Sequence, residues 1–413
     1  MDVHFNLRVG YAKREITPPL GSPLAGRPML VGRRARAIRD SLSARAVHIE
    51  GKSGHITILV ADLLLVTKAL HQQVAQTSGR PPENLLVLAT HTHSGPGGYW
   101  QGRHLESFMG PYDACARDRL IERLAETVRE AVQCTRTSKV SAVSIDMHGM
   151  STNRRNHNRP VDPVLTLLRF NVKGDSPICI VSFGAHPIVG LERRPFTITA
   201  DYPGEICERL ERLGLRPLFV QGACGGTSPA YFHLALEEHL SRLCGALVNE
   251  ISTALPRMQP CDVPQVIVEQ IPLQLSFAET RITPDGLPPV RAIEDIIQPL
   301  RRYLVRMAEQ GAVDNHNLSL TIVGMGRVVF VGIPGEVGPE LSMAIRRVFS
   351  PNNVVVASLC NGYAGYLHKR SDYQYEHGIR MLGLYENAMR LAGRDAGDSI
   401  LSQLEQSRMR MAL

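Results

Sequence analysis

The 413-residue chain has eight cysteines but no CxxC pair, and it has only one tryptophan. Most of the cysteines lie in apolar or helical stretches, so we expect buried, reduced thiols rather than a disulfide framework. The longest apolar segment, ITILVADLLLV at 56–66, is too short to cross a bilayer and contains Asp62. The first residues show no basic stretch followed by an apolar run, so we expect no signal peptide and a soluble, cytoplasmic protein without a transmembrane segment.

A strong excess of one charge is also missing. The chain has 46 Lys and Arg against 39 Asp and Glu, a formal net charge of +7. Apart from the basic stretch between Arg33 and Arg39, the basic residues are interleaved with acidic ones, so nucleic-acid binding through that stretch is a weak alternative. The hydrophobic fraction of 44% suffices for a large core and excludes a disordered chain.

Short β-branched runs alternate with longer amphipathic stretches, which predicts an α/β protein with mixed β-sheets layered with helices. The expected strands span 45–50, 55–62, 84–90, 166–172, 177–184, 217–222, 263–277 and 353–360, with a hairpin at 319–336. The expected helices span 69–79, 114–133, 204–214, 237–255 and 292–311, with one more at the C-terminus. We expect one catalytic domain over 1–413, with possible lobes 1–258 and 259–413.

The most informative segment is NLLVLATHTHSGPGG at 84–98, in which an apolar strand runs into His91, Thr92 and His93 and then a glycine-rich loop. The two-residue period of a strand would place both imidazoles on one face, where they could bind one metal ion or one substrate atom. The alternative is a hydrogen-bonded histidine pair at a strand end.

Other polar residues also follow predicted strands. His186 ends the apolar run PICIVSFG and is either structural or a ligand. Asp201 in TADYPGE could orient a ligand, bind substrate or cap the next helix. Glu336 in VGIPGE is either a charge at a helix N-terminus or an oxygen ligand. The tyrosines at 363–375 could pack on the surface, bind a metal or donate to an oxyanion.

Several segments together resemble the neutral/alkaline (non-lysosomal) ceramidase family. They are GYAKREITPPLGSPLAGR, ATHTHSGPGGYW, NRRNHNRPVDPVLTLLRF, GACGGTSP, IPGE, and NGYAGY followed by YE. They occur in that family's order over roughly residues 8–390, and HTHSGPGG is the most specific of them. The resemblance implies a zinc-dependent amidase that splits an N-acyl sphingoid base into fatty acid and amine, and hence a role in sphingolipid metabolism.

Carried over position by position, the resemblance implies a zinc site without cysteine. Its ligands would be His91, His186, Glu336 and Tyr366. Two imidazoles, a carboxylate and a weakly bound phenol form a coherent zinc set that leaves room for water.

The same resemblance implies the catalytic residues. His93 would hydrogen-bond the water or the substrate oxygen, while Arg154 and Tyr375 would stabilise a tetrahedral oxyanion. Tyr373 is the other candidate for the tyrosine that stabilises the oxyanion. Tyr373, Asp201 and Ser228 are expected to bind substrate. The implied reaction is attack of metal-activated water on a C–N amide bond, with His93 or a tyrosine as the proton donor to the amine.

The chain departs from the family pattern in three places. One is the stretch between Tyr366 and the Tyr-Glu pair at 375–376, which is shorter than the family's. Family members commonly carry N-x-G-D-x-S-P, where this chain has Ala223 and Gly226 in place of Asn and Asp but keeps Ser228. Ser228 lacks a G-x-S-x-G elbow, so a nucleophilic serine is less favoured than a turn serine. Family ceramidases continue into a β-sandwich domain, which we do not expect in a chain that stops at Leu413.

Two other functions stay open. One is a biosynthetic zinc enzyme that acts on a small-molecule amide or ester as a hydrolase or by reverse N-acyl transfer. The other is a catalytically silent homologue that binds a ligand. The expected partner in each case is a small or lipid-like molecule, and the sequence does not indicate an oligomeric state.

Overall fold

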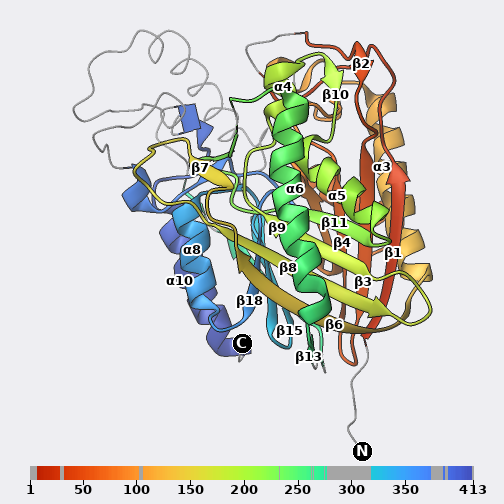
Figure 1. The fold of residues 1–413 in the computed structure, drawn as a ribbon, viewed down its shortest axis with the longest axis vertical. Coiled ribbons are helices and arrows are strands. Elements are labelled where there is room, and N and C mark those ends of the chain that lie inside the picture. Colours follow the sequence, from red (N-terminus) through yellow and green to blue (C-terminus); the bar gives the residue numbers. More distant parts are fainter. Residues whose placement is uncertain are drawn as a thin grey trace, which may run out of the picture.

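The computed structural model has the predicted layered α/β architecture, in which two β-sheets pack face to face between helices (Figure 1). The structure describes residues 7–27, 32–101, 106–231, 233–261, 263, 265–273, 275–276, 318–373, 385–386 and 389–411. The helix expected at 292–311 lies outside these residues. The division into lobes stays a prediction.

The larger sheet has nine strands and is mixed. In spatial order they are β11 (Arg216–Gln221), β9 (Ile178–Phe183), β8 (Val164–Val172), β6 (Arg136–Asp146), β1 (Leu7–Glu15), β3 (Ser43–Glu50), β4 (His55–Ala61) and β5 (Leu85–Ala89), and β13 (Pro260–Cys261) also pairs with β6. The edge pairs β9–β11 and β4–β5 are parallel, and the pairs between them are antiparallel. Strands β1 and β6 were not predicted from the sequence.

The smaller sheet contains β14 (Ile267–Leu273), β15 (Leu318–Met325), β16 (Val328–Gly332) and β18 (Asn353–Ala357) in that order. The predicted hairpin at 319–336 is confirmed, because β15 and β16 pair antiparallel across a turn at Gly326, whose φ of 58° is readily adopted by glycine. Strands β16 and β18 are parallel and are joined through helix α8 (Pro339–Val348).

Strand alternation gives the smaller sheet two apolar faces. Val328 and Phe330 of β16 pack against residues of the larger sheet, such as Val47. Val329 and Val331 point the other way and pack in the cluster covered by α8 and α10 (Ala396–Met411). Because both faces of β16 are buried, its sequence VVFVG is continuously apolar.

Helices cover the outer faces of the two sheets. On the outer side of the larger sheet lie α1 (Lys68–Ser78), α3 (Ala114–Gln133), α5 (Asp201–Arg212) and α6 (Leu236–Ala254). Figure 1 shows α8 and α10 at the left of the molecule, α3 at the right and α6 between them. These helices lie close to the predicted ranges, except for α8, which was not predicted. No described helix has both the length and the apolar character needed to span a membrane.

Local sequence signals explain where the first helix begins and ends. The hydroxyl of Thr67 accepts a hydrogen bond from the backbone N–H of Leu70 and caps α1. Gly79 ends the helix with a φ of 69°, in the left-handed region that suits glycine.

The basic stretch between Arg33 and Arg39 is tied into the fold. The buried guanidinium of Arg33 donates to backbone carbonyls, including that of His93 at 2.5 Å. Arg39 forms ion pairs with Asp40 at 2.6 Å and with Glu205 at 3.1 Å. Both side chains therefore serve internal contacts rather than a continuous basic surface.

Candidate metal centre

The segment 358–361, directly after β18, brings three strand ends together. The N–H of Ser358 donates to the carbonyl of Gln221 at the end of β11 (2.9 Å), and the N–H of Asn361 donates to the carbonyl of Val87 in β5 (2.9 Å). The side chain of Asn361 also accepts from the N–H of Val87 at 2.7 Å. The loops that follow β5, β11 and β18 therefore meet at one place.

His91 and His93 lie in the turn after β5. Their ring centroids are 4.8 Å apart, so the two imidazoles converge as predicted. The prediction that strand alternation brings them together is wrong. Strand β5 ends at Ala89, and His91 has a φ of 69°, which no strand residue adopts. The imidazoles are brought together by a turn rather than by strand alternation.

Backbone carbonyls set the orientation of the three histidines near this turn. The Nδ1 atoms lie 2.7 Å from the carbonyl oxygen of Leu64 for His91, 2.8 Å from that of Gly26 for His93 and 3.0 Å from that of Cys224 for His186. A carbonyl only accepts, so each Nδ1 carries a proton, and in the neutral ring Nε2 is left to bind a metal ion. The Nε2 atoms of His91 and His186 are 3.1 Å apart, and those of His91 and His93 are 3.4 Å apart.

The environment keeps two of these histidines neutral. Burial, followed by the positive charge of Arg154, lowers the pKa of His186 well below its ordinary value. Burial and the neighbouring His91 do the same to the pKa of His93. The Nε2 atoms of His91 and His186, only 3.1 Å apart, are placed to bind one cation together.

Glu336 completes the cluster from strand β17 (Glu336–Val337), after a tight Pro-Gly turn. Its Oε2 lies 3.3 Å from Nε2 of His91 and 3.7 Å from Nε2 of His186, while Oε1 accepts from the hydroxyl of Tyr363 at 2.8 Å. The side chain is buried, and Oε2 has no hydrogen-bond partner among the described residues. An unpartnered buried carboxylate oxygen beside two imidazole lone pairs calls for a positive charge.

Within the described parts of the chain, four side chains form a group that could hold a metal ion. They are His91, His186, Cys224 and Glu336, whose ligand atoms all lie within 4.8 Å of one another. Nitrogen, oxygen and sulfur donors in this combination are those that zinc takes in proteins. The residues present therefore fit the ion that the sequence led us to expect, although Cys224 was not expected among them.

Tyr366 and Arg154 adjoin this group. Tyr366 lies in β19 (Tyr366–Leu367), which pairs in parallel with β17 so that Tyr366 is opposite Glu336. Its hydroxyl oxygen accepts a hydrogen bond from Nη2 of Arg154 at 3.3 Å, and the same Nη2 is 3.5 Å from Nε2 of His186. The structure thus brings the expected ligands His91, His186, Glu336 and Tyr366 to one place, with Arg154 beside them.

The carboxylate of Glu386 holds Arg154 in place. It accepts from Nε of Arg154 at 2.5 Å, from Nη1 of Arg155 at 3.1 Å and from the backbone N–H of Gly226 at 3.1 Å. Burial alone would raise the pKa of Glu386, but Arg154, His368 and Arg155 hold that pKa at about 2. The ion pair is therefore charged at any pH at which the protein would work.

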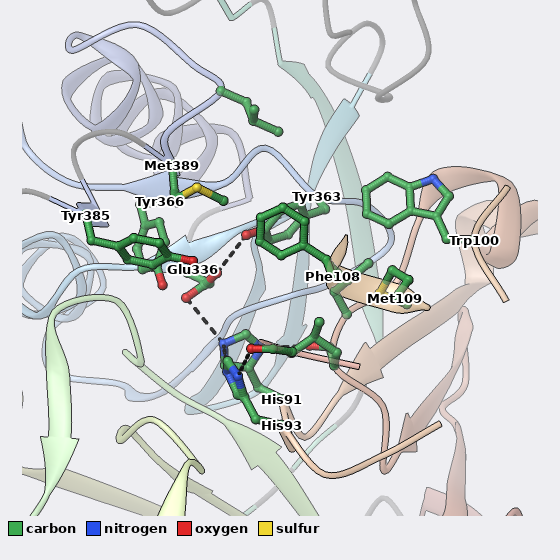
Figure 2. A pocket seen from close by; sticks show the side chains of 14 residues that line it. His91, His93, Trp100, Phe108, Met109, Glu336, Tyr363, Tyr366, Tyr385 and Met389 are labelled. Carbon is green, nitrogen blue, oxygen red and sulfur yellow. Dashed lines mark hydrogen bonds and ion pairs between the residues drawn. The ribbon is translucent and has the colours of Figure 1, made fainter. Parts of the chain in front are cut away.

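An apolar pocket opens above the cluster (Figure 2). In Figure 2, Trp100, Phe108 and Met109 lie on one side and Tyr366, Tyr385 and Met389 on the other, with Tyr363 and Glu336 between them and His91 and His93 at the base. Leu64, Leu65 and Leu391 complete much of the lining. A pocket that is aromatic and aliphatic above and polar at its base suits a substrate with a long apolar part and one polar reacting group.

The structure adds a tyrosine to the site that was not expected. Tyr375 lies outside the described residues, whereas Tyr385 lines the pocket. Glu386, the next residue, anchors Arg154. The chain contains two Tyr-Glu pairs, at 375–376 and at 385–386, and the family resemblance pointed to the first. The structure places the second in the wall of the pocket.

The three further residues expected to bind substrate do not line the pocket. The hydroxyl of Tyr373 accepts from the N–H of His368 at 3.2 Å and donates to the carbonyl of Tyr366 at 3.4 Å. The carboxylate of Asp201 accepts from the N–H groups of Gly190 (2.7 Å) and Tyr202 (2.8 Å), so it fixes backbone at the start of α5. Ser228 lies in the short strand β12 (Thr227–Pro229).

Two residues of the centre, Cys224 and Glu386, were not predicted from the sequence. Cys224 lies in the run GACGGTSP. There the comparison with the family pattern concerned Ala223, Gly226 and Ser228, and not the cysteine. The only signal for Glu386 was the second Tyr-Glu pair. Neither the approach of Cys224 to His186 nor that of Glu386 to Arg154 follows from local spacing, because both contacts are long-range.

The family model described as "Neutral/alkaline non-lysosomal ceramidase, N-terminal" matches residues 7–212. The chain belongs to this ceramidase family. The matched part contains His91, His93, Arg154 and His186, while Glu336 and Tyr366 lie beyond it.

Relatives of this ceramidase-family chain agree with that assignment. It is similar to the neutral ceramidase of Mycobacterium tuberculosis (strain ATCC 25618 / H37Rv), at 24% identity over 202 residues. That match covers 43% of this chain and 32% of the relative, so it spans about a third of the relative's length.

Solved structures show the same fold. The neutral ceramidase from Pseudomonas aeruginosa superposes with a TM-score of 0.76 at 19% identity, over 98% of this chain and 75% of that one. A ceramidase complexed with C2 superposes with a TM-score of 0.76 at 17% identity, over 99% of this chain and 76% of that one. The mixed, layered α/β fold expected from the sequence is thereby confirmed.

Proposed function

We propose that this protein is a zinc-dependent hydrolase that cleaves the C–N amide bond of an N-acyl substrate, with a ceramide-like lipid as the first candidate. The observation that carries the proposal is the buried cluster of His91, His186 and Glu336, in which an unpartnered carboxylate oxygen faces imidazole lone pairs. Membership of the ceramidase family supports the reaction class.

Zinc bound here would supply Lewis-acid polarisation of a carbonyl and a bound water of lowered pKa. The residues of the chain would hold and orient it. His91 and His186 are held by the carbonyls of Leu64 and Cys224, which fixes the tautomer that binds a metal through Nε2. Glu336 is held by the hydroxyl of Tyr363.

Arg154 is placed to stabilise negative charge that develops on the amide oxygen. Its Nη2 is directed towards Tyr366 and His186, while Nε is held by Glu386. A donor that is fixed before the reaction needs no reorganisation in the transition state, and removing one such donor typically raises the barrier by about 2.7–4 kcal/mol. Tyr385, in the same wall, is the candidate for a second donor.

His93 is placed to accept a proton. Its Nδ1 proton is held by the carbonyl of Gly26, and its Nε2 lone pair faces the cluster. Because burial and His91 lower the pKa of His93, the ring stays neutral and can accept a hydrogen bond at Nε2. It can therefore orient a nucleophilic water and pass a proton on towards the leaving amine.

The apolar lining selects the substrate class. Trp100, Phe108 and Met389 face the space above the cluster, where they would contact an acyl chain or another long apolar group rather than a small polar metabolite. The complex with C2 concerns the related ceramidase and supports a lipid-like N-acyl substrate for this chain only by analogy.

The test combines metal analysis with a panel of N-acyl amides that vary in chain length and head group. We expect about one zinc ion per chain, hydrolysis that increases with chain length, and loss of both metal and activity in the His91→Ala variant. His71→Ala removes another buried histidine, whose Nε2 lies 3.0 Å from the carbonyl of Leu85, and should keep zinc and activity. Purified protein that lacks zinc and hydrolyses amides in the presence of a chelator contradicts the proposal.

The same panel tests the alternative function, in which the site acts on a small amide or ester. Faster turnover of short, polar acyl compounds or of esters than of long-chain amides would support that alternative. The pocket lining leads us to expect the opposite order.

A further inference from the structure

Cys224 differs from the other cysteines in its surroundings. Cys179, Cys244 and Cys360 are buried among apolar side chains of the core. Cys224 is also fully buried and belongs to an apolar core cluster, but its sulfur is in addition part of the group of ligand atoms formed with His91, His186 and Glu336. It is thus a thiol within reach of the proposed metal position.

The loop that carries Cys224 is fixed against the strand of Glu336. The N–H of Gly225 donates to the carbonyl of Val337 at 3.0 Å, and a Cβ at Gly225 would lie 2.7 Å from the carbonyl oxygen of Glu336. Only glycine permits this approach. The backbone of the loop that carries Cys224 is therefore held close to the backbone of Glu336.

The main chain of Cys224 already serves the cluster. Its carbonyl oxygen accepts from Nδ1 of His186 at 3.0 Å and from the N–H of Thr227 at 3.2 Å. The first contact directs Nε2 of His186 towards the other ligand atoms. The same residue thus orients one ligand through its backbone and presents a sulfur through its side chain.

Independent evidence that an ion binds here comes from the other side of the cluster. Oε2 of Glu336 is buried, lacks a hydrogen-bond partner among the described residues and lies 3.3 Å from Nε2 of His91. The Nε2 atoms of His91 and His186 are 3.1 Å apart. A cation would satisfy all three atoms, and the sulfur of Cys224 lies within its reach.

We propose that Cys224 is a thiolate ligand of the metal ion bound by His91, His186 and Glu336. The inference rests on the metal site of the proposed function and goes beyond it, because the ligand set expected from the family contains no cysteine. On binding, a metal–sulfur bond replaces the S–H bond, and the proton is released to solvent.

A thiolate changes the chemistry of the site in two ways. With one thiolate and one carboxylate the ligand charge balances that of a divalent ion, whereas a site with two histidines and one glutamate leaves one positive charge. A thiolate also favours thiophilic ions such as zinc and cadmium over manganese and magnesium. The site is therefore expected to be more selective for thiophilic ions than a site of nitrogen and oxygen ligands alone.

X-ray absorption at the zinc edge of the wild-type protein tests the inference without any variant. We expect a sulfur neighbour at the zinc–thiolate distance of about 2.3 Å, together with nitrogen and oxygen neighbours at about 2.0–2.2 Å. In Cys224→Ser the sulfur neighbour should disappear. Cys244→Ser, a buried cysteine whose thiol contacts the carbonyl of Tyr202 in helix packing, is the matched control and should retain it.

Metal affinity gives a second readout. Replacing residues that only orient a ligand typically costs about 10–100-fold in affinity, so loss of a direct ligand in Cys224→Ser should cost more than about 100-fold for zinc. The loss should be greater for cadmium than for manganese. Zinc with only nitrogen and oxygen neighbours in the wild-type protein, or unchanged affinity in Cys224→Ser, overturns the inference.

These outcomes separate the inference from the proposed function, because neither readout uses an amide substrate. Sulfur-ligated zinc in a protein that hydrolyses no amide keeps the inference and overturns the hydrolase. Zinc without sulfur in an active amidase does the reverse. Protein that binds no zinc overturns both.

Discussion

The two sides of the metal centre are held by different forces. On the histidine side, formed by His91, His93 and His186, each ring is oriented by one backbone carbonyl. On the tyrosine side, formed by Tyr363, Tyr366 and Tyr385, the wall is fixed by buried charges, above all by Glu386 between two arginines.

The difference shows which changes each side can tolerate. A backbone carbonyl is present whatever the side chain, so the histidine side depends on loop conformation and is sensitive to changes in glycine. The tyrosine side depends on one carboxylate, and removing its charge takes away the negative charge that two buried guanidinium groups share. Substitutions should therefore act through different mechanisms on the two sides.

The largest effect is expected on the tyrosine side, from Glu386→Gln. The amide keeps the size of the side chain but removes the negative charge that Arg154 and Arg155 share. Breaking a buried ion pair in this way typically costs about 3–5 kcal/mol, which urea unfolding would measure as a loss in the free energy of unfolding. Arg154 should also lose its orientation, and hydrolysis should fall with it.

The control for this variant is Glu208→Gln on the surface of α5. Glu208 pairs with Arg212 one helical turn away, and both side chains are at least half exposed. Exposed pairs contribute about 0–1 kcal/mol, so this change should be nearly neutral. Equal effects of the two substitutions would show that the buried network does not hold the tyrosine side.

Next in size is the effect of Tyr385→Phe on catalysis. The structure places Tyr385 in the pocket wall near Glu336 and Arg154, whereas the sequence led us to Tyr375. Loss of one oxyanion donor costs about 2.7–4 kcal/mol of barrier, or roughly 100- to 1000-fold in kcat. Zinc content should not change.

Tyr375→Phe is the matched variant, since it removes the same hydroxyl from the other Tyr-Glu pair. We expect its kcat to stay near that of the wild type. A large loss in Tyr375→Phe and none in Tyr385→Phe would restore the assignment made from the sequence and would refute a catalytic role for Tyr385.

The same contrast explains what the sequence could predict. The histidine side is encoded in one contiguous motif, because ATHTHSGPGG contains both the end of β5 and two of the imidazoles. Residue periodicity also predicted most helices and the hairpin β15–β16, because amphipathic spacing is a local property. The turn geometry at His91 was not predicted, since a positive φ in a residue other than glycine is imposed by tertiary contacts.

The tyrosine side was harder to predict for a physical reason. Glu386 is paired with Arg154 across 232 positions of sequence, and Cys224, in the loop after β11, meets Glu336 of β17 although the two are far apart in sequence. Spacing rules carry no information about such contacts. Strands β1 and β6 were missed because they contain exposed charged residues, such as Lys13 and Lys139, that interrupt the apolar pattern.

A glycine substitution tests the histidine side, with a smaller expected effect on stability. Gly26 has a φ of 108°, and a Cβ there would lie 2.8 Å from Nδ1 of His93. Gly26→Ala should therefore displace the ring, and a misplacement of about 1 Å can cost about 100-fold in rate. The strain of the left-handed conformation adds about 1–2 kcal/mol of destabilisation.

Gly21→Ala is the matched control for Gly26→Ala. Gly21 has a φ of 86°, but no described atom lies within 4 Å of the position that a Cβ would take there. Both variants should lose similar stability in thermal unfolding, while only Gly26→Ala should lose activity. Similar activities in the two would show that the carbonyl of Gly26 does not position His93 for catalysis.

The pH dependence of the Glu386 ion pair, which is small for each single pH unit, gives a further test. The pKa of Glu386 is about 2 in the folded protein, below its ordinary value of 4.5, because the arginines outweigh burial. A depressed carboxyl pKa stabilises the folded state above pH 4.5, and this contribution is lost as the pH falls from 4.5 towards 2. The stability gap between wild type and Glu386→Gln should therefore be constant near neutral pH and shrink below pH 4.5, by at most about 1.4 kcal/mol per pH unit.

Urea unfolding of both proteins at a series of pH values measures that gap directly, because every other titrating group is common to the two chains. A gap that stays constant down to pH 2 would mean that Glu386 is not held charged by Arg154 and Arg155. The tyrosine side would then depend on packing alone, and the contrast with the backbone-held histidines would disappear.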